Sequence, residues 1–335
     1  MRRLLIVRLG SIGDIVHAAP VAANLRAHDP AVEIDWVVEA ALAPLVEMIT
    51  PVTRTITIRT RAVMRPGGWI DAIQALRERD YDAALDVQGL VKSATLARAS
   101  GARRVIGFDR ASLREPLAAW GYSETVAAVE GEHVIDRNLS ILRALQVPIA
   151  DARACPIEPG AASPALAGFL ATAGQHIAIV NPGANWPNKR WPPEHFAAVA
   201  QHLAREHGLA PIVTWGPGDE AMVAAVIDAS GGVVQAAPPT SLRDYLVLAR
   251  RASIVVSGDT GPLHLAAAMH TPIVGIYGPT DPRRNGPWHL RDRCVSVFDQ
   301  CTCHHKRACT AARWCLGDVS PAAVCDAVDR RLRLA

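Results

Sequence analysis

The sequence predicts an α/β protein made of two halves, each built on a doubly wound parallel sheet. Short apolar stretches alternate with helical patterns along the chain, which is typical of such sheets. These stretches are apolar on both faces, as parallel strands covered by helices must be. The 335 residues are many for one hydrophobic core and suit two. A proline-rich segment, 147–166, interrupts the pattern, and we expect the linker between the halves there.

We assign the first half to residues 1–155, the second to 170–318 and a terminal helical segment to 319–335. The strands predicted in the first half are 4–8, 34–38, 55–58, 83–87 and 104–108, and its helices are 14–27, 69–79, 90–99 and 134–145. The strands predicted in the second half are 177–180, 211–214, 254–256 and 273–277, and its helices are 194–206, 219–229, 242–252 and 263–269. We expect a last helix, 321–334, to pack back on the first half. Ligands of such folds bind outside the carboxyl ends of the strands, so we expect two Rossmann-like domains that face each other across a cleft.

Composition and charge exclude several classes of protein. Half of the residues are apolar and a fifth are charged, which is ordinary for a soluble globular protein. The net charge of +3 is too small to indicate a nucleic-acid partner, and we expect none. The apolar run before Arg8 is too short for a secretory signal, and no stretch approaches the roughly 20 apolar residues of a membrane span. We therefore expect a cytoplasmic protein that touches at most a membrane surface.

A glycine-rich turn, Gly10-Ser11-Ile12-Gly13-Asp14, follows the first predicted strand and opens a helix. Its glycines let a ligand approach the backbone, and the helix start offers N–H groups and a partial positive charge. The turn lacks the third glycine of the dinucleotide fingerprint. Two interpretations of Asp14 stay open on spacing alone: a catalytic carboxylate at the strand end, or an ordinary helix cap.

A second turn, 257–262, follows the strand at 254–256 and opens a helix rich in alanine. Small residues and a proline in the first helical turn are typical of a helix start that binds phosphate. Asp259 and Thr260 can cap this helix or bind sugar and phosphate oxygens. An ordinary capped helix explains the same pattern.

The loop after the strand at 177–180 carries two adjacent cations, Lys189 and Arg190, between Trp186 and Trp191. Either cation can neutralise a diphosphate. A surface loop fixed by a tryptophan is the alternative. The turn at 278–282, after the strand at 273–277, needs no explanation beyond turn chemistry.

Five segments, taken in their order along the chain, resemble one family. They are the turn at 10–14, the segments 86–93 and 189–192, the turn at 257–264 and the segment 277–282. Together they look like the ADP-heptose:lipopolysaccharide heptosyltransferases, glycosyltransferase family 9, and they cover most of the chain. The first half, including 36–39, looks most like the heptosyltransferase I branch. That branch adds the first heptose to the Kdo region of lipid A.

The resemblance implies a GT-B fold and a metal-independent, inverting transfer of heptose from ADP-L-glycero-D-manno-heptose that needs no cofactor. The residue implied as general base is Asp14, which takes the proton of the acceptor hydroxyl as this attacks the anomeric carbon. The ADP leaving group needs cations and N–H donors. The implied donor-binding residues are Lys189, Asp259, Thr260, Gly261, Pro262, His264, Asn181 and Gly183.

The implied acceptor is Kdo-lipid A or another sugar of the lipopolysaccharide inner core, reached from the cytoplasmic face of the inner membrane. Guanidinium groups suit its carboxylates and phosphates, and they also attract an anionic membrane surface. Two stretches rich in arginine, 54–65 and 103–114, fit this role, although solvated surface arginines explain any single one. The residues expected at the acceptor site are Ser11, Gly13, His17, Arg59, Arg61, Gln88 and Lys92.

Five of the seven cysteines lie between 294 and 315. Four of them, Cys301, Cys303, Cys309 and Cys315, could hold structural zinc or iron, although their spacing matches no standard zinc finger. Free thiols in a surface insertion are the alternative, and a disulfide framework is not expected in a large cytoplasmic protein. The cluster departs from the heptosyltransferase I pattern and resembles Cys-rich C-terminal segments of other family members.

Other functions therefore stay open. The departure allows an enzyme of the heptosyltransferase II or III type, or one with another acceptor. The same fold also serves sugar-nucleotide epimerases and nucleotide-sugar-binding proteins without catalysis. A redox or metal-sensing module built on the cysteines is a third class.

Overall fold

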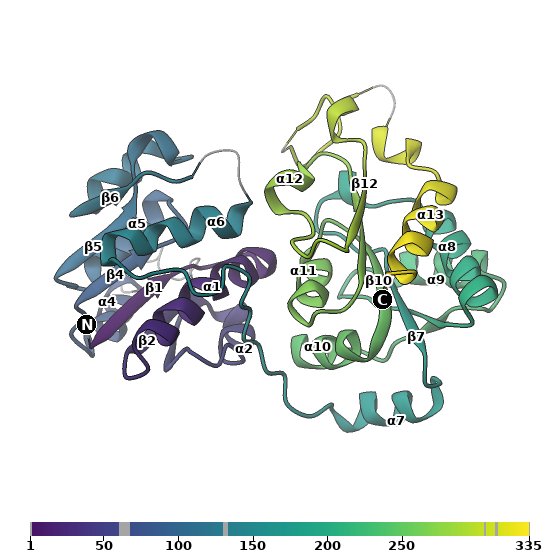
Figure 1. The fold of residues 1–335 in the computed structure, drawn as a ribbon, viewed down its shortest axis with the longest axis horizontal. Coiled ribbons are helices and arrows are strands. Elements are labelled where there is room, and N and C mark those ends of the chain that lie inside the picture. The colour runs from purple at the N-terminus through teal and green to yellow at the C-terminus, as the bar shows by residue number, and fades with distance from the viewer. Residues whose placement is uncertain (1, 60–67, 130–132, 305, 312–313, 335) are drawn as a thin grey trace. The chain divides into compact units, whose positions relative to one another are not determined.

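The computed structural model describes residues 2–59, 68–129, 133–304, 306–311 and 314–334. The chain divides into two compact units, Met1–Glu158 and Pro159–Ala335 (Figure 1). Each unit contains a six-stranded sheet, and neighbouring strands in both sheets run parallel. The predicted α/β class, with one doubly wound sheet in each half, is confirmed.

The first unit alternates strands and helices as the sequence predicts. Its strands are β1 (Arg3–Val7), β2 (Glu33–Glu39), β3 (Arg54–Ile58), β4 (Ala83–Asp86), β5 (Arg104–Phe108) and β6 (Glu124–Val126). Its α-helices are α1 (Ile12–His28), α2 (Ala43–Val46), α4 (Gly68–Arg77), α5 (Val91–Ala99) and α6 (Val134–Leu139). Short 3-10 helices are η1 (Ala40–Leu42), η2 (Arg110–Ser112), η3 (Pro116–Gly121) and η4 (Ser140–Leu145).

The second unit repeats this plan. Its strands are β7 (Ile177–Asn181), β8 (Ala210–Val213), β9 (Gln235–Ala236), β10 (Ala252–Gly258), β11 (Ile273–Tyr277) and β12 (Arg293–Ser296). Its α-helices are α7 (Pro164–Thr172), α8 (Pro193–His207), α9 (Glu220–Ala229), α10 (Leu242–Arg251), α11 (Gly261–Ala268), α12 (Pro282–Asn285) and α13 (Pro321–Leu332). Short 3-10 helices are η5 (Pro187–Lys189), η6 (Phe298–Gln300) and η7 (Cys315–Asp318).

Strand order reverses once in each sheet. The first sheet has the order β3-β2-β1-β4-β5-β6, and the second has β12-β11-β10-β7-β8-β9. The reversal lies between β1 and β4 in the first sheet and between β10 and β7 in the second. Loops leave the two strands on opposite sides at such a point, which opens a crevice for ligands at the carboxyl edge.

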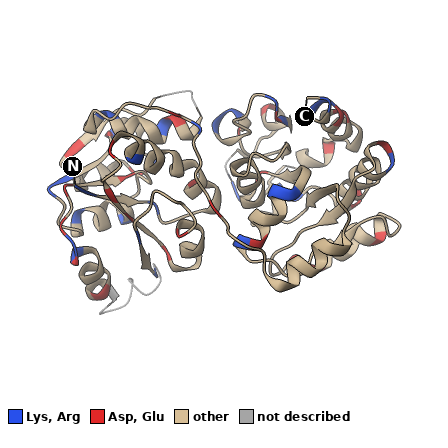
Figure 2. Cartoon of the chain, turned by 60° about the horizontal axis from the view of Figure 1, so that its bottom comes forward, with Lys and Arg blue, Asp and Glu red and all other residues tan. Residues whose placement is uncertain are grey.

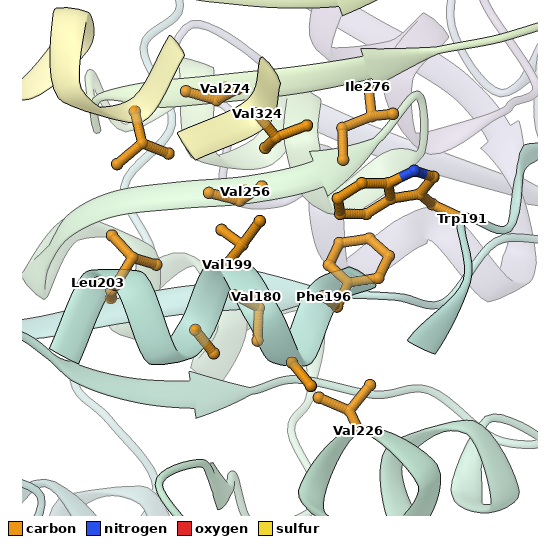
Figure 3. Packing of buried hydrophobic residues seen from close by; sticks show 14 of the residues in the cluster. Val180, Trp191, Phe196, Val199, Leu203, Val226, Val256, Val274, Ile276 and Val324 are labelled. Carbon is orange, nitrogen blue, oxygen red and sulfur yellow. The ribbon is translucent and has the colours of Figure 1, made fainter. Parts of the chain in front are cut away.

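Apolar packing in the second unit joins its sheet to α8, α9 and α13. Trp191 and Phe196, at the start of α8, lie edge to face with ring centroids 5.0 Å apart and pack near Val256 and Ile276 (Figure 3). We expected the terminal helix to pack back on the first half. Its buried residue Val324 instead belongs to this core, because the apolar face of α13 covers the second sheet beside α8.

The predicted interior strands and their helices are confirmed, whereas the edge strands β6, β9 and β12 were missed. These strands are short and partly exposed, so they lack an apolar run. The predicted linker ends earlier than expected, because Pro164 starts α7 and the Ser163 hydroxyl accepts from the Leu166 N–H. The helix predicted at 134–145 is α-helical only as α6 and continues as η4.

Basic and acidic residues are interspersed along the chain in both units (Figure 2). No helix among the described residues is long and apolar enough to cross a membrane.

Candidate active site

The polar groups of the first unit gather where β1 and β4 end side by side. The Arg8 guanidinium, just past β1, donates to the Val87 carbonyl past β4 at 2.7 Å. The Gln88 side-chain oxygen accepts from the Leu9 N–H at 2.8 Å. The backbone carbonyl of Arg8 accepts from the Trp36 indole at 3.1 Å. These bonds fix the two strand ends and the turn between β1 and α1.

Asp14 lies in the first turn of α1, with 36% of its side chain exposed. Its Oδ1 lies 2.5 Å from Arg8 Nη2, and its Oδ2 accepts from the Ser11 N–H at 2.9 Å. The Ser11 hydroxyl lies 3.2 Å from the same oxygen. The carboxylate thus binds the start of its own helix, as the cap interpretation expects, and it is also partly exposed to solvent. The catalytic interpretation stays a prediction.

The other residues predicted for the acceptor site differ in their accessibility. Gly13 and His17 are buried in α1, and the His17 ring lies edge-on to His133 with centroids 5.2 Å apart. Lys92 on α5 and Arg59 after β3 are exposed. Arg61 lies outside the described residues.

A buried carboxylate, Asp86, holds the turn that carries Gln88. Its oxygens accept from Tyr122 Oη at 2.7 Å, Ser93 Oγ at 2.8 Å, the Gln88 N–H at 2.9 Å and the Gly89 N–H at 3.1 Å. Burial raises the pKa of Asp86, and these hydrogen bonds oppose that rise. Asp86 therefore serves the architecture of the β4–α5 turn.

In the second unit, Asn181 and Gly183 support the loop after β7. The Asn181 amide nitrogen donates to Ser257 Oγ of β10 and to the Gly183 carbonyl, both at 3.2 Å, and its oxygen accepts from Thr214 at 3.1 Å. A side chain at Gly183 would collide with the Asp219 carboxylate. The donor-binding role of these two residues stays a prediction, and their contacts within the protein join the loop to the strands and to Asp219.

Asp259 is the centre of a polar cluster at the carboxyl edge of the second sheet. This buried carboxylate follows β10 and accepts from four side chains. The donors are Lys189 Nζ at 2.5 Å, Thr280 Oγ1 at 2.6 Å, Asn285 Nδ2 at 2.8 Å and His264 Nε2 at 3.2 Å. Two carboxylate oxygens offer about four acceptor positions, so the protein fills them. Asp259 therefore holds the side chains around it in place, above all that of Lys189.

Charge holds this cluster together. Burial alone would raise the pKa of Asp259, but the hydrogen bond from His264 and the positive charge of Lys189 outweigh it and keep that pKa far below its usual range. Lys189 also donates to the Asp259 carbonyl at 3.2 Å and lies over the Trp186 ring, 4.7 Å from its centroid. The ammonium group is thus held in one place beside the start of α11. Its neighbour Arg190 instead pairs with Asp219 at 3.7 Å.

The start of α11 is where the sequence predicts an anion site. Thr260 is its N-cap and Pro262 lies in its first turn, yet the Thr260 side chain makes no capping bond. Its hydroxyl lies 3.2 Å from Ser257 Oγ and 3.4 Å from the Gly258 carbonyl. Pro262 has no N–H, and the Leu263 N–H donates to the Thr260 carbonyl at 3.1 Å. In this first turn the Gly261 N–H is therefore the backbone group that can bind an anion.

Sequence reasoning missed Arg8, Thr280 and Asn285. The turn at 278–282 was attributed to turn chemistry alone, which is wrong, because Thr280 reaches Asp259. One signal in the sequence could have located the residues that follow β11. β11 lies next to β10 in a parallel sheet, so residues that follow the two strands meet at one edge.

The cysteine cluster is partly assembled. Cys301 and Cys303 are buried, with sulfur atoms 3.5 Å apart, and the Cys301 thiol also contacts Cys315. Burial raises the pKa of Cys301. The Asn188 amide lies 4.0 Å from the Cys303 sulfur, which links the cluster to the loop of Lys189.

The fold and these polar edges place the protein among the glycosyltransferases with two Rossmann-like units, the GT-B type. The family model of glycosyltransferase family 9 (heptosyltransferase) matches residues 69–315, and the chain belongs to this family. It is 30% identical to lipopolysaccharide heptosyltransferase 1 of Pseudomonas aeruginosa, over 92% of this chain and 87% of that protein. It is also 30% identical to lipopolysaccharide heptosyltransferase 1 of Escherichia coli K12, over 84% and 89%.

A solved structure of a heptosyltransferase has the same fold as this chain. The E. coli heptosyltransferase WaaC bound to ADP-2-deoxy-2-fluoro heptose is similar with a TM-score of 0.76 and 26% identity, over 98% of this chain and 99% of that chain. The resemblance inferred from the sequence motifs, including the heptosyltransferase I branch, is thereby confirmed.

The charge of the Asp259 cluster predicts how the stability of the fold changes with pH. A carboxyl group with a depressed pKa stabilises the fold above its unfolded pKa of about 3.9, and this contribution is lost as pH falls through the folded value. We expect Asp259→Asn to lower the urea midpoint at pH 7. The difference in urea midpoint between the variant and the wild type should shrink as pH falls from about 5 to about 2. Over that range the wild type loses the stabilisation that the charged Asp259 carboxylate gives it.

The matched control is Asp228→Asn, which changes an exposed aspartate of α9 in the same unit. Its urea midpoint should follow the wild type at every pH. A deficit of Asp259→Asn that stays constant down to pH 2 would contradict the charge-based account of the cluster.

Proposed function

We propose that this protein transfers heptose from ADP-L-glycero-D-manno-heptose to the Kdo region of lipid A, or to another inner-core sugar of lipopolysaccharide. The observation that carries the proposal is the Lys189–Asp259 pair beside the start of α11, in a chain similar to heptosyltransferases over nearly its whole length. The curated relatives are named lipopolysaccharide heptosyltransferase 1, which favours the first-heptose reaction.

The second unit binds the donor in this proposal. The diphosphate lies at the start of α11, where the Gly261 N–H and the helix dipole favour negative charge. Lys189 adds a fixed positive charge as the leaving ADP develops negative charge. Thr260, Gly261 and Pro262 form the turn itself. Four residues act indirectly, because they hold Lys189 and the loops after β7 and β10 in place. They are Asp259, His264, Asn181 and Gly183.

Asp14 of the first unit acts as the general base. The acceptor hydroxyl attacks the anomeric carbon of heptose, the bond from that carbon to the ADP oxygen breaks, and the hydroxyl proton moves to Asp14. A single displacement inverts the configuration at that carbon, and no step in it requires a metal ion. Arg8 and the Ser11 N–H hold the carboxylate in position, so that the proton acceptor is oriented before the substrate binds. Ser11, Gly13, His17, Gln88 and Lys92 surround or support this edge. Arg59, just after β3, and Arg61, outside the described residues, complete the proposed acceptor site.

A membrane-facing surface on the first unit would bring the enzyme to its lipid acceptor at the cytoplasmic face of the inner membrane. In η3, Leu117 and Trp120 are three residues apart, a spacing that places side chains on one face of a 3-10 helix. They are 62% and 81% exposed. Exposed basic residues adjoin them, with Arg110 in η2, Arg114, and Lys92 in α5. Trp, Leu and basic side chains together suit an anionic bilayer surface.

The cysteine cluster suits a structural metal clip. Thiolates that share one zinc or iron ion in a tetrahedral site lie close to the 3.5 Å that separates the sulfur atoms of Cys301 and Cys303. Cys315 contacts Cys301, and Cys309 is half-buried in the same segment. Cys301, Cys303, Cys309 and Cys315 would hold the ion, which would brace the loop of Lys189 through Asn188 and take no part in transfer.

Asp14→Asn tests the general base. The amide cannot accept the proton, so we expect the rate of heptose transfer in a single turnover to fall by about 10² to 10⁴-fold. Binding of ADP-heptose, measured by calorimetry, should stay unchanged because the donor binds the second unit. Asp71→Asn, an exposed aspartate of α4, is the control and should keep the wild-type rate. Unchanged turnover in Asp14→Asn would rule out Asp14 as the base.

Leu117→Ser tests the membrane-facing surface. Vesicles with about 30% phosphatidylglycerol should bind the wild type, and the variant should bind about tenfold more weakly because it buries less apolar surface. Leu290→Ser is the matched control, since Leu290 in the second unit is 97% exposed. Equal losses in the two variants, or none in either, would contradict this surface.

Cobalt tests the cysteine clip, because cobalt thiolates absorb strongly in the near ultraviolet. We expect protein loaded with Co²⁺ to show this band and Cys303→Ser to lose most of it. Cys155→Ser, which changes a cysteine of the first unit, should keep the band. Absence of the band in the wild type would leave the cysteines as free thiols.

A further inference from the structure

A second cluster of potential metal ligands lies between α8 and α13, apart from the cysteines. His202 and His207 of α8 both direct Nε2 at the same oxygen of Asp329 on α13. The distances from Nε2 to Asp329 Oδ1 are 2.7 Å for His202 and 2.8 Å for His207. The three ligand atoms lie within 4.8 Å of one another. Two imidazoles and one carboxylate thus converge on one point.

We propose that this triad binds a divalent transition-metal ion, with Zn²⁺ the best fit. Imidazole nitrogen and carboxylate oxygen are ligands that Zn²⁺ takes at about 2.0–2.2 Å, and three protein ligands plus water complete a tetrahedral ion. Magnesium and calcium prefer sites made of oxygen alone. The Nε2 atoms of the two histidines lie within hydrogen-bond distance of Asp329 Oδ1. A small shift of the imidazole rings away from this oxygen makes room for the ion between them.

The surroundings favour a cation. His207 is the last residue of α8 and Asp329 lies in the last turn of α13, so the negative ends of two helix dipoles lie at the site. The triad lines an open pocket together with Glu206 and Arg333, which gives ions and water access from solvent. Among these neighbours, the Glu206 carboxylate balances the Arg333 guanidinium.

The same contacts decide what must change when an ion binds. Each Nε2 lies within hydrogen-bond distance of Asp329 Oδ1, and it must offer its lone pair to the ion instead, so binding releases any proton that these nitrogens carry.

The site has a structural consequence. α13 packs on α8 through Val324 and Val328, and the triad adds a polar connection between the same two helices. The loop of Lys189 precedes the first turn of α8, whereas His207 ends the helix, about 20 Å away at 1.5 Å per residue. A bound ion would fasten the terminal helix to the unit and leave the transfer chemistry untouched.

Zinc titration of the full chain, stripped of metal with EDTA, tests the proposal in a Cys301→Ser/Cys303→Ser background that weakens the competing thiolates. We expect one equivalent of Zn²⁺ to bind and to raise the melting temperature. His207→Gln keeps a polar side chain that can still donate to Asp329 but lacks the imidazole. It should bind Zn²⁺ at least about tenfold more weakly. His176→Ala, which removes an exposed histidine of the same unit, should bind as its parent does.

Circular dichroism of each variant confirms that a loss of binding is not a loss of fold. Binding that vanishes in His207→Gln with helicity intact supports the site. Absence of saturable binding up to about 100 µM Zn²⁺, or equal affinity in His207→Gln and its parent, overturns it.

Discussion

Both sheets of this protein are parallel and are covered by helices, and this constraint decides where its chemistry can lie. Strands such as β7 are buried along their whole length, so polar side chains within them would lose their hydration. A buried polar group within a strand needs partners, as Asp35 of β2 has in Tyr81, and the larger polar clusters gather where the strands end. Strand order reverses between β1 and β4 and between β7 and β10, and the polar clusters of the two units lie at these two points.

The two aspartates at these edges illustrate two uses of a carboxylate. Asp259 is buried and accepts from four side chains, which leaves it the task of fixing Lys189. Removal of Asp259 would leave Lys189 without its carboxylate partner and would leave three further side chains without their acceptor. Asp14 is more exposed, and its contacts to Arg8 and Ser11 hold it in place. The first arrangement suits positioning, and the second suits proton transfer.

Sequence reasoning located the interior of each sheet because buried parallel strands are continuous apolar runs. It failed at the edges, where β9 and β12 are short and partly exposed. It also placed Lys189 and Asp259 in one ligand site without showing that they bind each other. That contact joins residues 70 positions apart and depends on the packing of two loops that follow different strands. Thr280 and Asn285 were missed for the same reason. The place of α13 was wrong because an amphipathic pattern identifies an apolar face but does not name the surface it covers.

The central claim is that the donor edge around Lys189 and the base Asp14 serve one reaction, heptose transfer to lipid A carrying Kdo. Incubation of the protein with ADP-heptose and Kdo-lipid A, followed by mass spectrometry of the lipid, tests this most directly. The account predicts a lipid product heavier by one heptose unit, with one ADP released for each product formed. No such product, together with transfer from a different sugar nucleotide, would contradict it.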